Sequence, residues 1–282
     1  MSEWNTLRWA YSPCPNDTFI FAALAQGIVP GVPSVARPRL EDIASLNALA
    51  KAGEADVIKI SACFYPQVRS YYQVLPCGGA MGMGVGPLLV AKQGFSGTLE
   101  SKHTVAIPGE TTTANLLLSH FYPKLTTREQ MEFSRIGPAV AAGKYDLGLL
   151  IHEGRFTFRE HGLQQVADLG ALWEAQFALP LPLGIILVRR DLPDKLKRQV
   201  RVAINKSLHT AKLKPPTVMG YVCEHAQEFS PTVLQQHIAL YVNNFTEEMG
   251  EEGKRALLRL WQLDNRLGSL TSAQVGAIFY QL

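Results

Sequence analysis

The chain has 282 residues, of which 47% are hydrophobic and 18% charged. It can therefore bury a large core in one or two globular domains, and it is not a disordered protein. Lys and Arg number 27 against 24 Asp and Glu, a formal net charge of +3. Because the basic residues are scattered and form no run, the charge argues against a nucleic-acid partner and suits a small anionic ligand.

The four cysteines lie far apart and form no CxxC pair, which excludes a zinc ribbon and a thioredoxin-type motif. Scattered cysteines in a chain of this length are typical of reduced cytosolic thiols. The first residues lack a basic segment followed by an apolar one, and no run of about 20 apolar residues occurs. We therefore expect a cytoplasmic protein without a membrane span. These cysteines are Cys14, Cys63, Cys77 and Cys223.

The first part of the chain alternates short apolar runs with helical patterns, which indicates a largely parallel sheet with helices on both faces. Asn16 or Asp17 can cap the first helix, because a short side-chain oxygen accepts hydrogen bonds from free backbone N–H groups. In chain order, we expect strands at 7–11, 56–60, 72–76 and 88–91, and helices at 18–27, 40–52 (stopped at Gly53) and 62–71.

A glycine-rich segment at 78–87 precedes the strand at 88–91. It matches neither GxGxxG nor a Walker loop, and no helix with a Lys-Ser/Thr start follows it. The alternatives are a phosphate cradle and a backbone hinge or tight loop, and the missing motif favours the hinge.

A second series of strands and helices follows, and the chain beyond Arg190 is almost wholly helical. The apolar strand at 181–189 resembles the one at 88–91, and the two flank the middle block. We therefore expect a smaller inserted lobe at 91–185 and a larger lobe made of 1–90 and 186–282. The remaining expected strands are 103–107, 145–151 and 166–169, and the expected helices are 114–121, 138–143, 192–212, 217–228, 232–241 and 250–262.

Two α/β lobes joined by two crossover strands form a clam with a central cleft, as in periplasmic-type (type II) binding proteins. Ligands bind in such a cleft because the carboxyl ends of strands and the N-termini of helices face it. Four loops, at 12–17, 59–61, 109–113 and 152–155, each join a strand to a helix through polar residues. Their free backbone N–H groups suit a carboxylate, although each loop taken alone also reads as simple helix capping.

His152 directly follows a buried strand, and a histidine with a pKa of about 6.5 can act as a general base. Lys59 ends another strand and can pair either with a substrate carboxylate or with an acidic neighbour. Cys14, at a helix N-terminus, is either a nucleophile or a small packed residue. The other six histidines form no HExxH pair and no Cys/His cluster, so we expect no metal site.

Several segments together resemble the 1,4-dihydroxy-6-naphthoate synthases, enzymes of the futalosine route to menaquinone. The similarity runs over nearly the whole chain, in order and at similar spacing. The segments are Ser12-Pro13-Cys14-Pro15-Asn16-Asp17-Thr18-Phe19, Lys59-Ile60-Ser61, Gly78-Gly79-Ala80, Gly84-Val85-Gly86-Pro87, Thr112-Thr113-Ala114, Ile151-His152-Glu153 with Arg155-Phe156-Thr157, Leu179-Pro180-Leu181-Pro182-Leu183-Gly184 and Tyr241-Val242-Asn243.

The resemblance implies a two-lobed fold similar to periplasmic binding proteins and a lyase that needs no cofactor. The lyase would convert cyclic dehypoxanthinyl futalosine into 1,4-dihydroxy-6-naphthoate and dihydroxyacetone. His152 falls on the family's proton acceptor. Glu110-Thr111 depart from the family pattern, and an acidic group facing the substrate there would repel its carboxylate. The segments that fall on the family's substrate-binding positions are Lys59-Ile60-Ser61 and Thr113-Ala114.

Two other functions remain open. A solute-binding protein without catalysis would have the same fold. A chorismate dehydratase, the sister enzyme on the same clam, is the second alternative, although the Ser-Pro-Cys-Pro-Asn-Asp start and the Ile-His-Glu segment point away from it. Incubation with each substrate separates the three.

Overall fold

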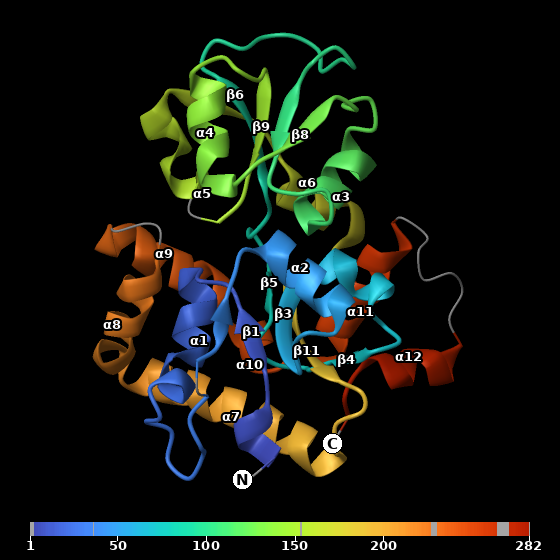
Figure 1. The fold of residues 1–282 in the computed structure, drawn as a ribbon. Coiled ribbons are helices and arrows are strands. Elements are labelled where there is room, and N and C mark those ends of the chain that lie inside the picture. Colours follow the sequence, from blue (N-terminus) through green and yellow to red (C-terminus); the bar gives the residue numbers. More distant parts are fainter. Residues whose placement is uncertain (1–2, 36, 153, 227–229, 264–270, 282) are drawn as a thin grey trace.

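The computed structural model describes residues 3–35, 37–152, 154–226, 230–263 and 271–281. The chain forms two α/β lobes stacked end to end with a waist between them, and both termini lie on the larger lobe (Figure 1). This is the two-lobed α/β architecture that the sequence predicts. Glu153 of the segment quoted above and the end of the helix expected at 217–228 lie outside the described residues.

The larger lobe is built on a mixed sheet of six strands in the order β2-β1-β3-β11-β4, with β5 also paired to β11. β1 is parallel to β2 and β3, whereas β11 is antiparallel to β3, β4 and β5. The expected largely parallel sheet is thus wrong, because β11 returns from the other lobe and enters the sheet from the opposite end. The strands are β1 (Trp9–Tyr11), β2 (Arg39–Leu40), β3 (Val57–Ser61), β4 (Tyr72–Val74), β5 (Ala80–Gly82) and β11 (Leu181–Arg189).

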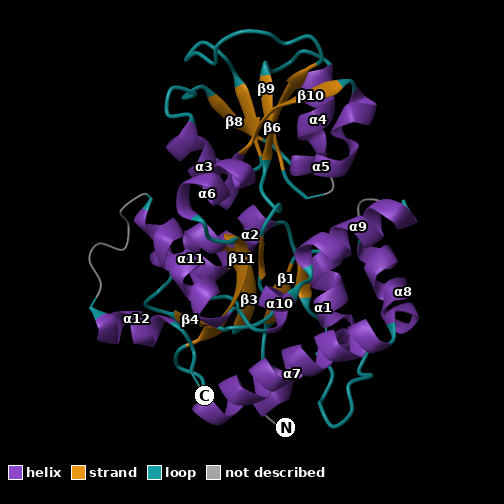
Figure 2. Ribbon diagram, turned by 180° about the vertical axis from the view of Figure 1, so that it is seen from behind, coloured by secondary structure: helices purple, strands orange, loops and turns teal. Residues whose placement is uncertain are grey.

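Helices cover both faces of this sheet and bury two separate apolar layers (Figure 2). One layer lies under α2, η2 and α11, and the other under α1, α7 and α8. The elements are η1 (Glu3–Thr6), α1 (Pro15–Ala25), α2 (Ile43–Ala52), η2 (Ala62–Gln67), α7 (Asp194–Leu213), α8 (Pro215–His225), α9 (Pro231–Tyr241), α10 (Asn244–Glu247), α11 (Gly250–Gln262) and α12 (Ser272–Ile278).

The smaller lobe has a five-stranded mixed sheet in the order β10-β6-β9-β7-β8. β6 is antiparallel to β9 and β10, and β7 is parallel to β8 and β9. Its elements are β6 (Leu88–Lys92), β7 (Val105–Ile107), α3 (Thr113–Phe121), β8 (Arg128–Gln130), α4 (Phe133–Ala141), β9 (Leu147–Leu150), α5 (Gly154–Thr157), η3 (Phe158–His161), β10 (Leu163–Asp168) and α6 (Leu169–Phe177).

Two expected helices differ from the structure for local reasons. The helix expected at 40–52 begins only at Ile43, because the Asp42 side chain caps it by accepting from the backbone N–H groups of Ala44 and Ser45; it ends as predicted at Gly53, whose φ is +69°. The helix expected at 62–71 is a 3₁₀ helix that ends at Gln67. Pro66 lies inside it, and a proline lacks the backbone N–H that an α-helix needs.

The two sheets are joined by residues 83–87 and 178–180, because β6 lies wholly in one sheet and β11 wholly in the other. The lobe boundaries expected after 90 and after 185 fall inside these two strands. We propose instead that each strand belongs as a whole to the lobe whose sheet it joins. The first connection lies within the glycine-rich segment at 78–87, for which the sequence favours a hinge or tight loop. At Gly86 an added Cβ would lie 2.2 Å from the Gly170 backbone, so the chain passes α6 closely enough to require glycine.

All four cysteines lie in the described part of the chain, and none forms a disulfide. Only Cys223 is exposed, and burial raises the pKa of the Cys77 thiol to about 12. We expect a thiol reagent at pH 8 to modify Cys223 rapidly in the native protein and all four thiols after denaturation without a reductant. Mass spectrometry of both samples gives the count, and fewer than four modified thiols in the denatured sample would contradict the expectation.

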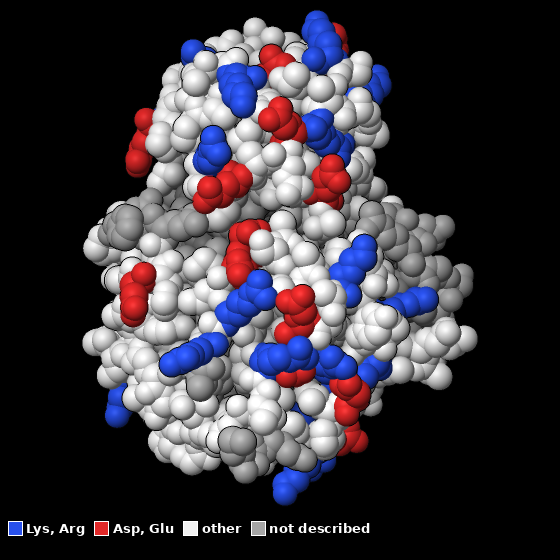
Figure 3. Space-filling model, in the orientation of Figure 1, with Lys and Arg blue, Asp and Glu red and all other residues white. Residues whose placement is uncertain are grey.

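On the face shown in Figure 3, basic and acidic side chains are interspersed over both lobes. Among the described residues, no helix combines the length and the apolar character needed to cross a membrane.

Candidate active site

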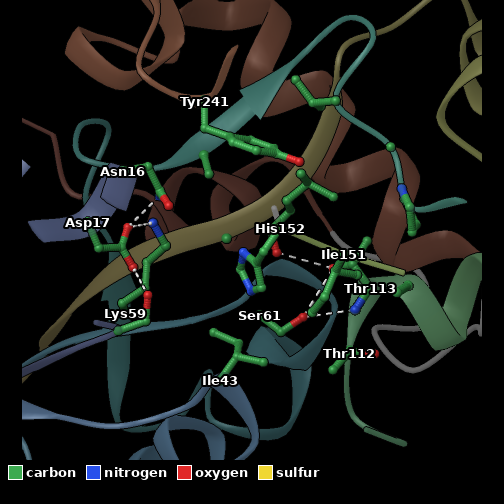
Figure 4. A pocket seen from close by; sticks show the side chains of 18 residues that line it. Asn16, Asp17, Ile43, Lys59, Ser61, Thr112, Thr113, Ile151, His152 and Tyr241 are labelled. Atoms are coloured by element: carbon green, nitrogen blue, oxygen red, sulfur yellow. Dashed lines mark hydrogen bonds and ion pairs between the residues drawn. The ribbon is translucent and has the colours of Figure 1, made fainter. Parts of the chain in front are cut away.

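A cavity of about 80 Å³ lies between the lobes, at the edge where strands of both sheets end (Figure 4). Its walls come from the segments that follow β1, β3 and β9, from the N-terminus of α3 and from the start of β11. This volume is below the ~300–1,000 Å³ of usual ligand pockets, so the lobes must separate to admit a drug-sized ligand. The polar residues that line it are Ser12, Asn16, Asp17, Lys59, Ser61, Thr112, Thr113, His152 and Tyr241.

A buried ion pair forms one end of the cavity. The Lys59 ammonium donates to Asp17 Oδ1 at 2.6 Å, and both side chains are almost fully buried. The Asp17 carboxylate also accepts hydrogen bonds from Ser12 Oγ at 2.7 Å and from Asn16 Nδ2 at 2.8 Å. Of the two partners expected for Lys59, the structure shows the acidic neighbour. Within the described part of the chain the Lys59 ammonium donates to Asp17 and to the Gly78 carbonyl at 3.4 Å, which leaves its third N–H for a ligand.

The expected capping role of Asn16 and Asp17 is wrong. α1 begins at Pro15 with Cys14 in the N-cap position, and no side chain caps this helix end. Proline is tolerated at the first helical position because its N–H would have no partner there. Asn16 and Asp17 therefore lie within the first turn, where their side chains point into the site and towards Lys59.

Ser61 and Thr113 connect the two lobes. Ser61 ends β3 in the larger lobe, and its Oγ accepts from the Thr113 backbone N–H at 2.9 Å and lies 3.1 Å from Thr113 Oγ1. Beside them, Asn47 on α2 donates through Nδ2 to the Thr111 carbonyl at 3.2 Å and to its hydroxyl at 3.0 Å. These contacts hold the start of α3 against the larger lobe.

Ile60 follows Lys59 in one predicted substrate-binding segment, and Ala114 follows Thr113 in the other. Side chains alternate along a strand, so Lys59 and Ser61 face the cavity while Ile60 is fully buried in the apolar core. Ala114 lines the cavity directly after Thr113. Glu110, which departs from the family pattern, is exposed and does not line the cavity.

His152 lies two residues beyond the end of β9, and its backbone has a φ of +54°. This left-handed conformation is uncommon for residues other than glycine, and it often marks functional positions. The Nε2 atom lies 3.7 Å from Cys14 Sγ, which brings the second sequence candidate into the site. The ring also contacts the edge of Phe133, with ring centroids 5.0 Å apart.

Burial lowers the pKa of His152 from 6.5 to about 4; Asp17 raises it and Lys59 lowers it further. The ring is only half-buried, but it lines the enclosed cavity, so its remaining surface is shielded from bulk water. The ordinary pKa near 6.5 assumed from the sequence is therefore wrong. At neutral pH the imidazole is uncharged and can accept a proton.

A pH profile tests this environment. If neutral His152 acts as the base, kcat/KM should stay level on the acid side to about pH 5 and fall about tenfold per pH unit below about 4. The titratable groups near the His152 ring are those of Cys14, Asp17, Lys59 and His237. NMR titration of the His152 ring, with circular dichroism as the folding control, should give the same value. An acid limb near pH 6.5 would mean that the ring is hydrated in the reacting state.

Two residues of α9 were not identified as site residues from the sequence: Tyr241 lines the cavity, and His237 is fully buried beside it. His237 and Tyr241 lie four residues apart on α9, which places them on one face of that helix. Their rings are in contact, with centroids 4.6 Å apart. Tyr241 stands in a quoted motif, whereas no pattern marks His237. Among the described residues, no group of three or more His, Cys, Asp or Glu side chains is placed to hold a metal ion.

A protein-family model described as menaquinone biosynthesis matches residues 7–265. A relative from Thermus thermophilus, named 1,4-dihydroxy-6-naphthoate synthase, is 47% identical over 255 residues, which cover 90% of this chain and 92% of the relative. A relative of the same name from Streptomyces coelicolor is 44% identical over 258 residues, with 90% of each chain covered.

Solved structures show the same fold. A crystal structure of a protein from Archaeoglobus fulgidus is 34% identical with a TM-score of 0.88, covering 95% of this chain and 99% of the other. The periplasmic aliphatic sulphonate binding protein of Escherichia coli is only 12% identical, yet it reaches a TM-score of 0.66 over 98% of this chain and 92% of its own. The second likeness concerns the fold alone, and it agrees with the clam predicted from the sequence.

Proposed function

Because the chain belongs to the menaquinone biosynthesis enzyme family, whose members at 44–47% identity are named 1,4-dihydroxy-6-naphthoate synthase, we propose that it is a carbon–carbon lyase. Its substrate is cyclic dehypoxanthinyl futalosine, and its products are 1,4-dihydroxy-6-naphthoate and dihydroxyacetone. The observation that carries this proposal is the position of His152 in a cavity between the lobes that the Ser61 and Thr113 hydroxyls also line.

The proposed reaction begins with proton transfer. Neutral His152 takes a proton from the bound cyclic substrate, and negative charge develops on a substrate oxygen. The Ser61 and Thr113 hydroxyls are the donors positioned to stabilise that oxygen. The third N–H of Lys59 is directed to the substrate carboxylate.

Bond cleavage follows. The carbon–carbon bond to the three-carbon fragment breaks, its electron pair goes to that fragment, and the new ring becomes aromatic. The imidazolium of His152 then returns a proton, so the base is regenerated. The two products together contain the atoms of the substrate, and the step is neither an oxidation nor a reduction. No cofactor is therefore part of the proposal.

Incubation of the purified protein with two candidate substrates tests the function. With cyclic dehypoxanthinyl futalosine, we expect mass spectrometry to detect equal amounts of naphthoate and dihydroxyacetone, and with chorismate we expect no change. Dehydration of chorismate would replace the proposal by the sister enzyme. Tight binding of the futalosine derivative without turnover, by wild type and His152→Asn alike, would favour a solute-binding protein.

Closure of the lobes should accompany binding, because the lining residues come from both lobes and the hydrogen bonds of Ser61 join them. Small-angle scattering should show a smaller radius of gyration with 1,4-dihydroxy-6-naphthoate than without it. Ser61→Ala should weaken naphthoate binding by about 1–3 kcal/mol, the effect of a buried hydrogen bond left unmade. Ser119→Ala, on the exposed part of α3, is the matched control. A radius that does not respond to the ligand would mean a clam fixed in one state.

A cytoplasmic location is a further part of the proposal, as is a small carboxylate-bearing substrate in place of a nucleic-acid or membrane partner. Four thiols without a disulfide are typical of a reducing compartment. Fractionation of the source cells, followed by detection of the protein in each fraction, tests the location.

A further inference from the structure

His237 is fully buried beside the candidate active site, although neither the sequence motifs nor the proposed reaction uses it. It lies on α9, which packs against α1, the helix that carries Asn16 and Asp17. The His237 ring is almost parallel to the His152 ring, with an interplanar angle of 17° and a centroid separation of 6.0 Å. The two histidines thus come from opposite lobes, and their rings lie side by side at the margin of the site.

The hydrogen bonds around Asn16 determine which nitrogen of His237 carries the proton. Asn16 Nδ2 donates to Asp17 Oδ1 at 2.8 Å, because an ionised carboxylate can only accept. The other amide atom, Oδ1, must then be the one that meets His237 Nε2 at 2.9 Å, and an amide oxygen can only accept. His237 Nε2 is therefore the donor. Burial and the nearby His152 lower the pKa of His237, so its neutral Nε2–H tautomer is present.

A continuous chain of hydrogen bonds results. The His237 Nε2–H donates to the amide oxygen of Asn16, and the Asn16 amide N–H donates to the Asp17 carboxylate. The same carboxylate accepts from the Lys59 ammonium. Asp17 and Lys59 are also the two charges that act on His152, in opposite directions. The orientation of the Asn16 amide thus links a residue that does not line the cavity to the charges beside the proton acceptor.

We propose that His237 is a positioning residue for this active site: its Nε2–H fixes the Asn16 amide, which in turn fixes the Asp17–Lys59 pair beside His152. The inference rests on the proposed function, since His152 is taken as the base. The competing view is that His237 is only a satisfied core histidine, which would matter for stability and not for the reaction.

Kinetics of four variants distinguish these views. His237→Phe keeps an aromatic ring but removes the donor, and we expect kcat to fall about tenfold while KM changes less than about twofold. His237→Gln supplies an amide N–H to the same oxygen and should recover most of kcat. Asn16→Ala should lower kcat to a similar extent. His209→Phe, which replaces an exposed histidine of α7, is the matched control and should leave kcat unchanged.

A double-mutant cycle supplies the deciding comparison. If His237 acts through Asn16, the double variant Asn16→Ala/His237→Phe should have nearly the kcat of either single variant. If His237 acts only through folding, each substitution would lower the activity independently by reducing the folded fraction, so the losses would add. The kcat per folded molecule, with the folded fraction measured by circular dichroism, would then be normal. Additive effects, or His237→Phe with normal kcat, overturn the proposal. If His237→Phe does not fold, Asn16→Ala and His237→Gln carry the comparison.

A substrate-independent measurement separates this inference from the proposed function. In protein labelled with ¹⁵N-histidine, the His237 ring should show a protonated Nε2 and an unprotonated Nδ1 at pH 7, and Asn16→Ala should weaken that preference. A protonated Nδ1 in the wild type contradicts the hydrogen-bond chain, whatever reaction the enzyme performs. If the tautomer is as expected and the wild type does not convert cyclic dehypoxanthinyl futalosine, the proposed reaction fails while the chain of hydrogen bonds stands.

Discussion

Replacing His152 by asparagine should lower kcat by roughly 10²–10⁴, the usual contribution of a positioned acid–base group. In the proposed reaction the neutral imidazole accepts the substrate proton and later returns it, and an amide of similar polarity cannot do either. The KM should change little, because the substrate carboxylate is assigned to Lys59. Steady-state kinetics with cyclic dehypoxanthinyl futalosine measure both constants.

His161→Asn provides the control for this experiment. His161 is an exposed histidine of the same lobe, at the end of η3, and its replacement should leave both constants unchanged. His152 occupies a left-handed backbone conformation that asparagine tolerates better than most residues, so the variant should fold. Normal turnover by His152→Asn, or lost binding with normal kcat, is the result that removes His152 from its assigned role.

The second large effect concerns the buried ion pair. Asp17→Asn should reduce the free energy of unfolding by about 3–5 kcal/mol, because it leaves the Lys59 ammonium buried without a counter-charge. Asparagine is close to aspartate in size, so the loss is electrostatic. Urea unfolding of the wild type and the variant gives the difference.

Two further variants sharpen this measurement. Removing both charges, as Asp17→Asn/Lys59→Met, should recover much of the lost stability but not the activity, since the Lys59 ammonium faces the cavity. Glu251→Gln breaks the exposed pair with Lys254 and should shift the urea midpoint far less. If Asp17→Asn were as stable as the wild type, the Lys59 charge would have to be relieved by water that enters the site.

Most strands could be predicted because their apolar runs are local patterns, whereas the short strands β2, β5 and β8 were not expected. The runs before Ser12, Ser61 and His152 are short and end in polar residues, so both lobes and the positions of these residues follow from the order of the chain. The direction of β11 could not be predicted in this way. It depends on the return of the chain from the smaller lobe, which brings the strand into its sheet antiparallel to β3.

The errors at the site arise from long-range contacts. Asn16 and Asp17 have the residue types of helix caps, and only the approach of Lys59, 42 positions later, makes the carboxylate an ion-pair partner. The pKa of His152 is lowered by burial between two lobes, a quantity that no local pattern contains. His237 had no signal at all, because its partner Asn16 is 221 positions away in the sequence.

The hydrogen bonds between Ser61 and Thr113 stabilise the closed arrangement of the two lobes relative to the open arrangement. These hydrogen bonds join the lobes around a cavity of about 80 Å³, so only the fraction of molecules with separated lobes can admit a larger ligand. The apparent dissociation constant equals the intrinsic one divided by that fraction; if one molecule in ten is open, the apparent affinity is about tenfold weaker. Substitutions that favour the open lobes and leave both hydroxyls in place should therefore tighten binding of a bulky ligand while slowing its conversion.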